Sequence, residues 1–135
     1  MIIRPYQPMD EEQVAEVWRL CGLVMPPNDP GQDIQRKMQV QPELFLVGVV
    51  KERVAATVMA GYDGHRGWLY SLAVAPARQR QGLGRRMVEE AESRLKAMGC
   101  RKINLQVRAS NAAVIGFYES LGFSVEERVS LGKRL

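Results

Sequence analysis

The stretch that decides the fold is Leu72-Ala73-Val74-Ala75-Pro76-Ala77-Arg78-Gln79-Arg80-Gln81-Gly82-Leu83-Gly84-Arg85-Arg86. It begins with the end of an apolar, strand-like run that stops at Pro76. It ends where apolar residues start to recur at helical spacing, from Leu83 to Met98. A strand, a loop with two glycines and an amphipathic helix in this order predict a mixed α/β fold.

The loop in this stretch is suited to binding a diphosphate. The first turn of any helix leaves backbone N–H groups unpaired and carries a partial positive charge. Gly82 and Gly84 have no Cβ atom that would keep an anion away from these amides. Four arginines flank the loop: Arg78, Arg80, Arg85 and Arg86. We therefore expect a phosphate-rich small ligand at the start of the helix.

Two common nucleotide-binding loops do not fit this stretch. A Rossmann loop requires a third glycine where this chain has Met87, and an acidic residue where it has Asn104. A Walker loop requires glycine and lysine followed by serine or threonine, which is absent here. For the loop taken alone, an ordinary helix start that happens to contain glycines stays open as the alternative.

Further strands and helices are predicted on both sides of this stretch. On the N-terminal side we expect strands at 2–6, 44–50, 54–62 and 68–75 and helices at 10–22 and 32–40, the first with Asp10 as its N-cap. On the C-terminal side we expect helices at 83–98 and 111–121, a strand at 102–107 and one or two closing strands within 123–135. A crossover helix joins the strands at 68–75 and 102–107, so these two should lie parallel. We expect one domain over residues 1–135.

Composition narrows the class of protein. The formal net charge is +4, and Cys21 and Cys100 have no partner at metal-ligand spacing, so both are expected to pack as small apolar side chains. No apolar run is long enough to span a membrane, and no charged leader precedes one. No aromatic residues are interleaved with the arginines, which disfavours nucleic-acid binding as an alternative. We expect a cytoplasmic protein that binds no metal, membrane or nucleic acid.

A second segment, Ser110 to Phe123, carries a candidate catalytic group. Asn111 and Tyr118 are seven residues apart, which places them on the same side of a helix. A phenol with an ordinary pKa of about 10 is protonated at neutral pH, so it can donate a proton to a leaving thiolate. The alternative is a half-buried tyrosine with Asn111 as a simple N-cap, and the segment alone leaves this open.

Together the two segments resemble the GCN5-related N-acetyltransferases, the GNAT family. The family's loop pattern, Gln/Arg-x-x-Gly-x-Gly/Ala, is matched by Gln79 to Gly84, and Leu72 to Pro76 resembles the strand that binds the pantetheine arm. The resemblance implies a GNAT fold: a twisted, mostly antiparallel sheet with a parallel, splayed central strand pair and four helices. It also implies acetyl-CoA as co-substrate and no metal.

The resemblance assigns roles to individual residues. The resemblance makes Tyr118 the general acid toward the CoA thiolate. The acetyl group then passes directly to an amine in a ternary complex, and a backbone N–H of the strand polarises the thioester carbonyl. The residues implied to contact the cofactor are Leu72, Ala73, Val74, Gln79, Arg80, Gln81, Gly82, Leu83, Gly84, Arg85, Asn111 and Tyr118. The alternative is a non-catalytic acetyl-CoA-binding sensor or regulatory subunit. It is suggested by Gln106, which stands where the RimI type of the family has a glutamate assigned as base.

The acceptor is not named by the sequence. Residues 28–30, 61–67 and 130–135 resemble the YpeA type, whereas 107–111 is similar to the RimI type, which acetylates the N-terminus of a ribosomal protein. Asp29 and Asp63 are candidates for the acceptor site. The general base stays open among Asp63, His65, Glu119 and a carboxylate that acts through water, as does the pairing of two copies into a homodimer.

Overall fold

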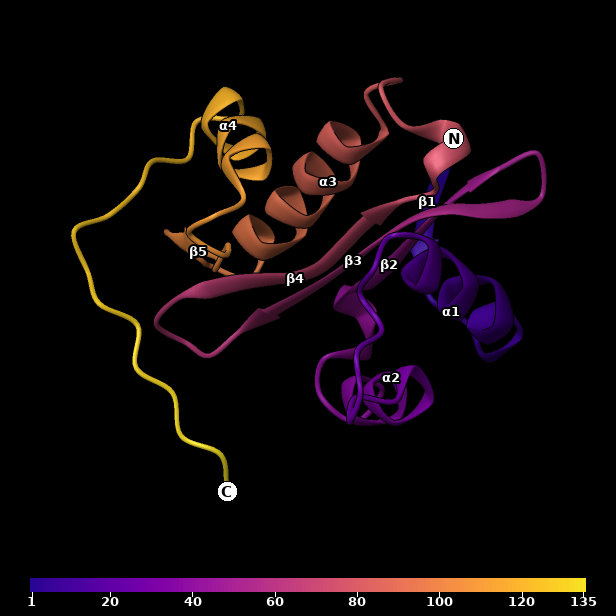
Figure 1. Ribbon diagram of the computed structural model, residues 1–135, viewed down its shortest axis with the longest axis horizontal. Helices are drawn as coiled ribbons and strands as arrows, with labels where there is room; N and C mark the ends of the chain where they lie inside the picture. The colour runs from indigo at the N-terminus through magenta and orange to yellow at the C-terminus, as the bar shows by residue number, and fades with distance from the viewer. The chain divides into compact units, whose positions relative to one another are not determined.

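A five-stranded sheet with the order β1-β2-β3-β4-β5 forms the centre of residues 1–105 (Figure 1). Its strands are β1 (Ile2–Pro5), β2 (Phe45–Val50), β3 (Arg53–Tyr62), β4 (Gly67–Val74) and β5 (Ile103–Asn104). Its helices are α1 (Glu11–Leu20), α2 (Pro30–Lys37) and α3 (Leu83–Ala97), with short 3-10 turns η1 (Pro8–Asp10), η2 (Pro42–Leu44) and η3 (Pro76–Arg78). The computed structural model describes residues 1–135 and divides them into two units, 1–105 and 106–135. The second unit contains α4 (Ala112–Ser120).

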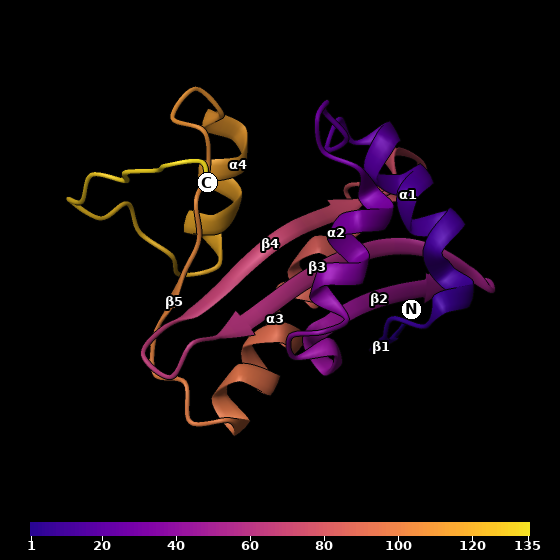
Figure 2. The same cartoon turned by 90° about the horizontal axis from the view of Figure 1, so that it is seen from below.

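Helices cover both faces of the sheet. Helix α3 lies on one face, and α1 and α2 lie on the other (Figures 1 and 2). The apolar stripe predicted for α3 is buried at Leu83, Met87, Val88, Ala91 and Leu95, whereas its last predicted member, Met98, lies after the end of α3 and is exposed. On the opposite face, the rings of Tyr6 and Phe45 stack with centroids 4.6 Å apart. No helix combines the length and the apolar character needed to cross a bilayer.

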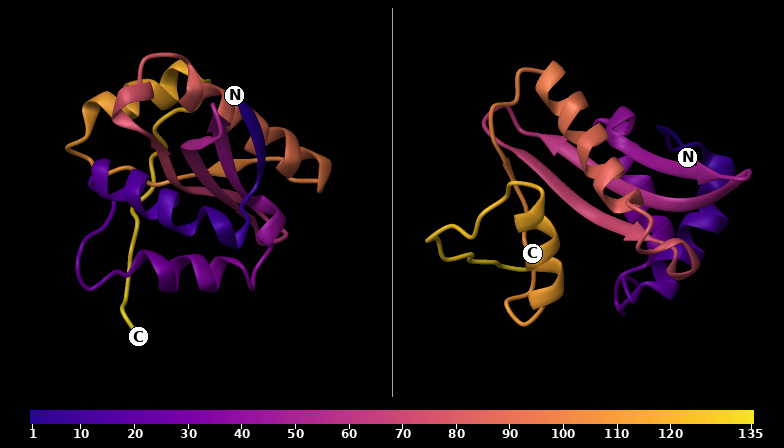
Figure 3. Two further views of the ribbon diagram at one scale, coloured as in Figure 1. Left: turned by 90° about the vertical axis from the view of Figure 1, so that its right-hand side faces the viewer. Right: turned by 90° about the horizontal axis from the view of Figure 1, so that it is seen from above.

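The edge of the sheet at β5 confirms one prediction and corrects another. Strands β1 to β4 pair antiparallel, and β4 pairs with β5 in parallel, as the crossover helix predicts. The parallel pairing holds only Gly67 with Ile103 and Trp68 with Asn104, whereas a strand was predicted over 102–107. Beyond Trp68 the outer edge of β4 therefore has no strand partner, and α3 crosses above this part of the sheet (Figure 3).

A bulge that no sequence pattern predicts interrupts β4 at Ser71. The register between β3 and β4 shifts between Thr57 and Met59, and Ser71 has a left-handed φ of 52°. The fully buried hydroxyl of Thr57 donates to the carbonyl of Ser71 at 2.8 Å and accepts from Nε1 of Trp18 at 3.0 Å. These bonds satisfy a carbonyl that the bulge has removed from the ladder, and so they fix the bulge in place.

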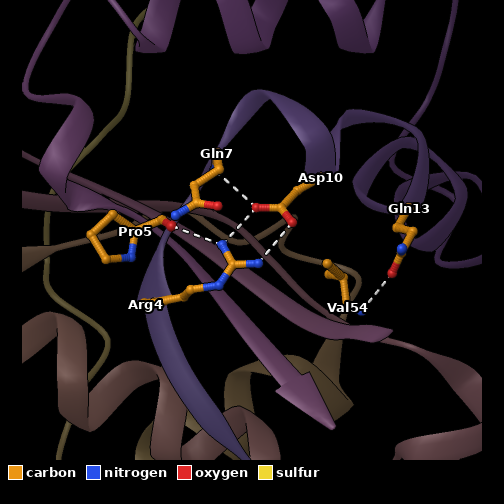
Figure 4. A network of polar contacts seen from close by, with 6 residues as sticks. All are labelled: Arg4, Pro5, Gln7, Asp10, Gln13 and Val54. Carbon is orange, nitrogen blue, oxygen red and sulfur yellow. Dashed lines mark hydrogen bonds and ion pairs between the residues drawn. The ribbon is translucent and has the colours of Figure 1, made fainter. Parts of the chain in front are cut away.

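Asp10 makes bonds that the predicted N-cap does not include (Figure 4). It directly precedes α1, but its side chain makes no capping bond to that helix. Its carboxylate instead accepts from the N–H of Gln7 at 2.8 Å and from both terminal nitrogens of Arg4 at 2.8 and 2.9 Å. A two-fold bond to a guanidinium is stronger than a bond to a neutral amide, which explains the choice of partner. The hydrogen bond from Arg4 lowers the pKa of Asp10.

Replacing Asp10 with asparagine is expected to lower the free energy of unfolding by about 2 kcal/mol, because it leaves the guanidinium of Arg4 without its carboxylate partner. The folded-state pKa of Asp10 lies below its unfolded value, so the stability it contributes is present above that unfolded value and is lost as the pH falls through the folded pKa. Urea unfolding between pH 2 and 7 measures both effects. Glu16→Gln is the control, because the pair between Glu16 and Arg19 is exposed and should contribute little.

The closing strands predicted within 123–135 are absent. After α4 the chain runs to the C-terminus without a strand, and Val125, Val129 and Leu131 are exposed. Alternating apolar residues favour a strand only when a partner strand completes the hydrogen-bond ladder, and none pairs with this segment. The expectation of one domain over the whole chain stays a prediction.

Candidate functional site

The loop between β4 and α3 forms an exposed cradle of backbone amides. Arg80 and Gly82 both have left-handed backbone conformations, with φ of 63° and 78°, so the chain turns sharply into α3. Gly82 occupies the N-cap position, and no side chain caps the helix. The first-turn amides of α3 are therefore presented to a ligand together with the positive end of the helix dipole.

The open edge of β4 leads directly into this loop. The N–H of Ala75 donates to the carbonyl of Ala55 on β3 at 2.7 Å. Backbone groups of successive residues in a strand point to opposite edges, so the N–H groups of Leu72 and Val74 face away from β3. That is the edge which β5 leaves without a partner beyond Trp68. An extended ligand can add to such an edge by main-chain hydrogen bonds.

Two side chains hold the carbonyl at the end of β4. The carbonyl of Val74 accepts from Nε2 of Gln79 at 3.0 Å and from the thiol of Cys21 at 3.2 Å. Burial raises the pKa of the Cys21 thiol, which makes it a poor nucleophile at neutral pH. Cys100 is buried and its thiol donates to the carbonyl of Lys102 at 3.3 Å. Both thiols therefore donate hydrogen bonds, in addition to the packing that the sequence predicts.

The predicted arginines surround the cradle with positive charge. Arg80, Arg85 and Arg86 are exposed, and Arg78 is half-buried. Arg85 lies 3.4 Å from Glu89 on the next turn of α3, and Arg86 donates to the carbonyl of Met1 at 3.1 Å. These contacts are at the surface, so the guanidinium groups keep their attraction for an anion. Gln79 and Gln81 are also exposed in this loop, whereas Leu83 is buried beneath it.

In the second unit, the structure places Asn111 at the start of α4 rather than within it. Its Oδ1 accepts from the N–H of Val114 at 3.2 Å, so the capping role left open by the sequence is observed. Tyr118 is buried, with 8% of its surface exposed, and its ring packs edge-on against Phe117 and Phe123. Burial raises the pKa of Tyr118 to about 12. The phenol therefore stays protonated throughout the neutral range.

Local hydrogen bonds make Asp63 a weak candidate for the general base. The carboxylate of Asp63 accepts from the N–H groups of His65 and Arg66, both at 2.7 Å, and from Nε1 of Trp68 at 3.3 Å. These bonds lower the pKa of Asp63, and a carboxylate with a lowered pKa accepts protons poorly. Asp63 thus organises the turn between β3 and β4. His65 and Glu119 are both exposed.

Asp29 and Gln106 have defined local partners. Asp29 is the N-cap of α2, accepting from the N–H of Gly31 at 3.2 Å, and α2 starts two residues earlier than predicted. It lines a hollow of about 330 Å³ whose other walls are Glu11, Glu12, Ala15, Arg19, Pro30 and Gly31. In the second unit, the side-chain amide of Gln106 donates to the hydroxyl of Ser130. An amide has no basic lone pair for an ammonium proton, so Gln106 does not serve as a base.

The open strand edge and the uncapped start of α3 together form a surface that can bind an extended ligand carrying a diphosphate. Residues 11–123 match the model of the Acetyltransferase (GNAT) family, so the chain belongs to this family. It is an acetyl-CoA-dependent acetyltransferase. The family and fold implied by the two sequence segments are thereby confirmed.

Known proteins resemble the chain along most of its length. It is 45% identical over 135 residues to an acetyltransferase of Yersinia enterocolitica, covering 100% of this chain and 96% of that protein. A solved structure from Agrobacterium tumefaciens gives a TM-score of 0.80 at 22% identity and covers 100% of both chains. The ribosomal-protein-S18-alanine N-acetyltransferase from Escherichia coli gives a TM-score of 0.75 at 28% identity, covering 91% of this chain and 77% of that one.

Proposed function

We propose that the protein moves the acetyl group of acetyl-CoA directly to an amine within a ternary complex. The observation that carries this proposal is the uncapped N-terminus of α3 directly after an open strand edge. The amides of Gln79 to Gly84 and Arg85 bind the diphosphate, and the flanking arginines balance its charge. The main chain of Leu72 to Val74 pairs with the pantetheine arm. The family resemblance also assigns Asn111 and Tyr118 to the donor site.

The proposed reaction uses these groups. The unprotonated amine attacks the thioester carbonyl carbon, the C–S bond breaks, and the sulfur leaves as a thiolate. The amine nitrogen, which is positively charged after the attack, loses its proton to solvent and becomes the amide nitrogen. A backbone N–H of β4 stabilises the negative charge that develops on the carbonyl oxygen. The Tyr118 hydroxyl donates to the departing sulfur. Holding both reactants together supplies much of the rate enhancement, because it removes the entropic barrier to their encounter.

An amine of low pKa suits this site better than a lysine side chain. Asp63 is a weak base and Gln106 is none, and His65 and Glu119 stay open as bases, so an acceptor that loses its proton readily is favoured. An α-amine has a pKa near 8, whereas that of a lysine amine is about 10.4. The 28% identity to the ribosomal-protein-S18-alanine N-acetyltransferase supports a peptide N-terminus as acceptor. The YpeA-type features favour a small member of the family without deciding between a peptide and a small amine.

CoA release in the presence of acetyl-CoA and a panel of amines tests the proposal. Peptide α-amines are expected to react faster than lysine side chains at pH 7.5. For an α-amine, kcat/KM should rise about tenfold per pH unit and level off near pH 8, because the unprotonated fraction of the amine follows this course. Plateau activity that begins near pH 6 would indicate a strong enzyme base and contradict the choice of acceptor.

Gln106 favours one alternative, a sensor that binds acetyl-CoA without turnover. Calorimetry separates the two functions. Binding of acetyl-CoA with no CoA released from any amine would support the sensor, and measured turnover would exclude it. A protein that binds neither acetyl-CoA nor CoA would overturn both.

A further inference from the structure

We propose that Cys21 and Gln79 act together as positioning residues for the acetyl donor, by fixing the peptide group between Val74 and Ala75. The inference rests on the proposed donor site and goes beyond it, because neither side chain is assigned a contact with CoA through its thiol or amide group. Both donate to the carbonyl of Val74, at 3.2 and 3.0 Å. A carbonyl oxygen has two lone pairs and accommodates both donors.

The peptide group at this position is held from both sides. Its carbonyl faces the open edge of β4, where Cys21 and Gln79 reach it. Its N–H points the other way and donates to the carbonyl of Ala55 at 2.7 Å. The plane of this peptide is thereby fixed. It adjoins the Cα of Val74, so it limits the backbone rotations that set the direction of the preceding N–H, that of Val74, which we propose to pair with the donor.

The two donors come from different parts of the chain. Cys21 is the C-cap residue of α1, and Gln79 opens the diphosphate loop. The carbonyl oxygen of Val74, at the end of β4, is therefore hydrogen-bonded both to α1 and to the loop before α3. These two bonds to the Val74 carbonyl therefore keep a fixed distance between the open edge of β4 and the loop before α3. A donor that binds to both needs this distance to be constant.

A simpler account gives each side chain a separate role: Cys21 fills space, and Gln79 closes its own loop. The two accounts differ in one respect. If the side chains share a function, each donor compensates for loss of the other, and losing both is worse than the product of the two single losses. If they are independent, the effects multiply.

The test measures the Kd for acetyl-CoA by calorimetry and the Tm of the free protein. Cys21→Ala and Gln79→Met remove one donor each without adding charge, and each is expected to raise Kd about threefold. The double variant is expected to raise it about 30-fold. Cys21→Ser keeps a hydroxyl donor and should bind within about twofold of the wild type. The matched controls are Cys100→Ala, which removes the other thiol–carbonyl bond, and Gln35→Met, at an exposed position of α2.

The outcomes decide the inference separately from the proposed function. Wild-type protein that binds acetyl-CoA while the double variant binds equally well overturns the inference alone. So does a double effect equal to the product of the singles, or a Cys21→Ser variant as weak as Cys21→Ala. A loss of Tm that accounts for the whole change in Kd points to folding and also overturns it. Wild-type protein without affinity for acetyl-CoA overturns the proposed function together with this inference.

Discussion

Replacing Tyr118 with phenylalanine is expected to lower kcat about 100-fold while leaving the Kd for acetyl-CoA nearly unchanged, because one hydrogen-bond donor to the charge that develops in the transition state typically contributes a factor of this size. The change removes only the hydroxyl. The ring contacts with Phe117 and Phe123 need no oxygen, so α4 should keep its local packing. Stopped assays of CoA release at saturating donor, together with calorimetric binding, separate the two quantities.

The raised pKa of Tyr118 defines how this hydroxyl acts. With a pKa of about 12, the phenol is a much weaker acid than a thiol, whose ordinary pKa is about 8.5. Full transfer of the proton to a free thiolate is therefore unfavourable. The phenol is expected to donate a hydrogen bond that strengthens as the sulfur gains charge, with solvent completing the protonation. No loss of activity from ionisation of Tyr118 is expected below about pH 11.

Tyr62→Phe is the matched control for this prediction. It also removes a phenol oxygen, one that lies 3.2 Å from the carbonyl of Gly64 in the first unit. Its kcat should stay within about twofold of the wild type. Equal kcat values for Tyr118→Phe and the wild type, measured with an active acceptor, would exclude Tyr118 from the chemical step.

Replacing Gly82 with alanine is expected to weaken acetyl-CoA binding about 30-fold, and with valine further. A Cβ at this position meets no protein atom within 4 Å, so the fold has room for it. The methyl group instead occupies space next to the first-turn amides of α3, where we propose that the diphosphate binds. The left-handed φ of 78° adds a strain of about 1 kcal/mol to the folded protein.

Gly99→Ala separates the strain from the lost binding. Gly99 has a φ of 95° at the other end of α3, and its Cβ would also meet nothing within 4 Å. Both variants should lose a similar free energy of unfolding, as measured by urea titration. Only Gly82→Ala should raise the Kd for acetyl-CoA. Equal Kd values for the two variants would place the diphosphate elsewhere.

The elements that the sequence predicts well are those marked by regularly spaced apolar residues and ended by glycine or proline. The stripe from Leu83 to Leu95 gave α3, and α3 in turn predicted the parallel pair. The turn between β2 and β3 was placed correctly, but its backbone was not. Lys51 and Glu52 both have left-handed φ values, 50° and 66°, although neither is the glycine or asparagine that usually marks such a turn.

Other features depend on contacts between distant residues and leave no local pattern. The bulge at Ser71 is stabilised by Thr57, fourteen positions away, and Asp10 is bound by Arg4 rather than by its own helix. The side chain of Gln41 hydrogen-bonds both the N–H and the carbonyl of Tyr62, as a neighbouring strand would. Nothing in the residues around Gln41 predicts these bonds. The prediction of closing strands within 123–135 was wrong for the same reason, because alternating apolar residues do not show whether a partner strand is present.

For the donor site, the sequence predicted the loop and its glycines because the N-terminus of a helix binds anions wherever it occurs. The double hold on the Val74 carbonyl was not foreseen. Cys21 carries no motif, and its distance of 53 positions from Val74 is closed only by the fold. The general base is similarly beyond the reach of sequence, because local hydrogen bonds decide whether a carboxylate such as Asp63 is basic.

Because of the bulge at Ser71, odd-numbered residues of β4 face one side of the sheet before the bulge and the other side after it. Ahead of it, a side chain at Gly67 would meet Cys100 and Leu95, on the side of α3. After the bulge, Ala73 packs in the hydrophobic cluster on the other face of the sheet, with Val14 and Trp18 of α1. Excising one residue here would restore plain alternation and exchange the faces of everything that follows. Genetic deletion at this point should therefore abolish folding, whereas shortening the exposed turn after Tyr62 by one residue should be tolerated.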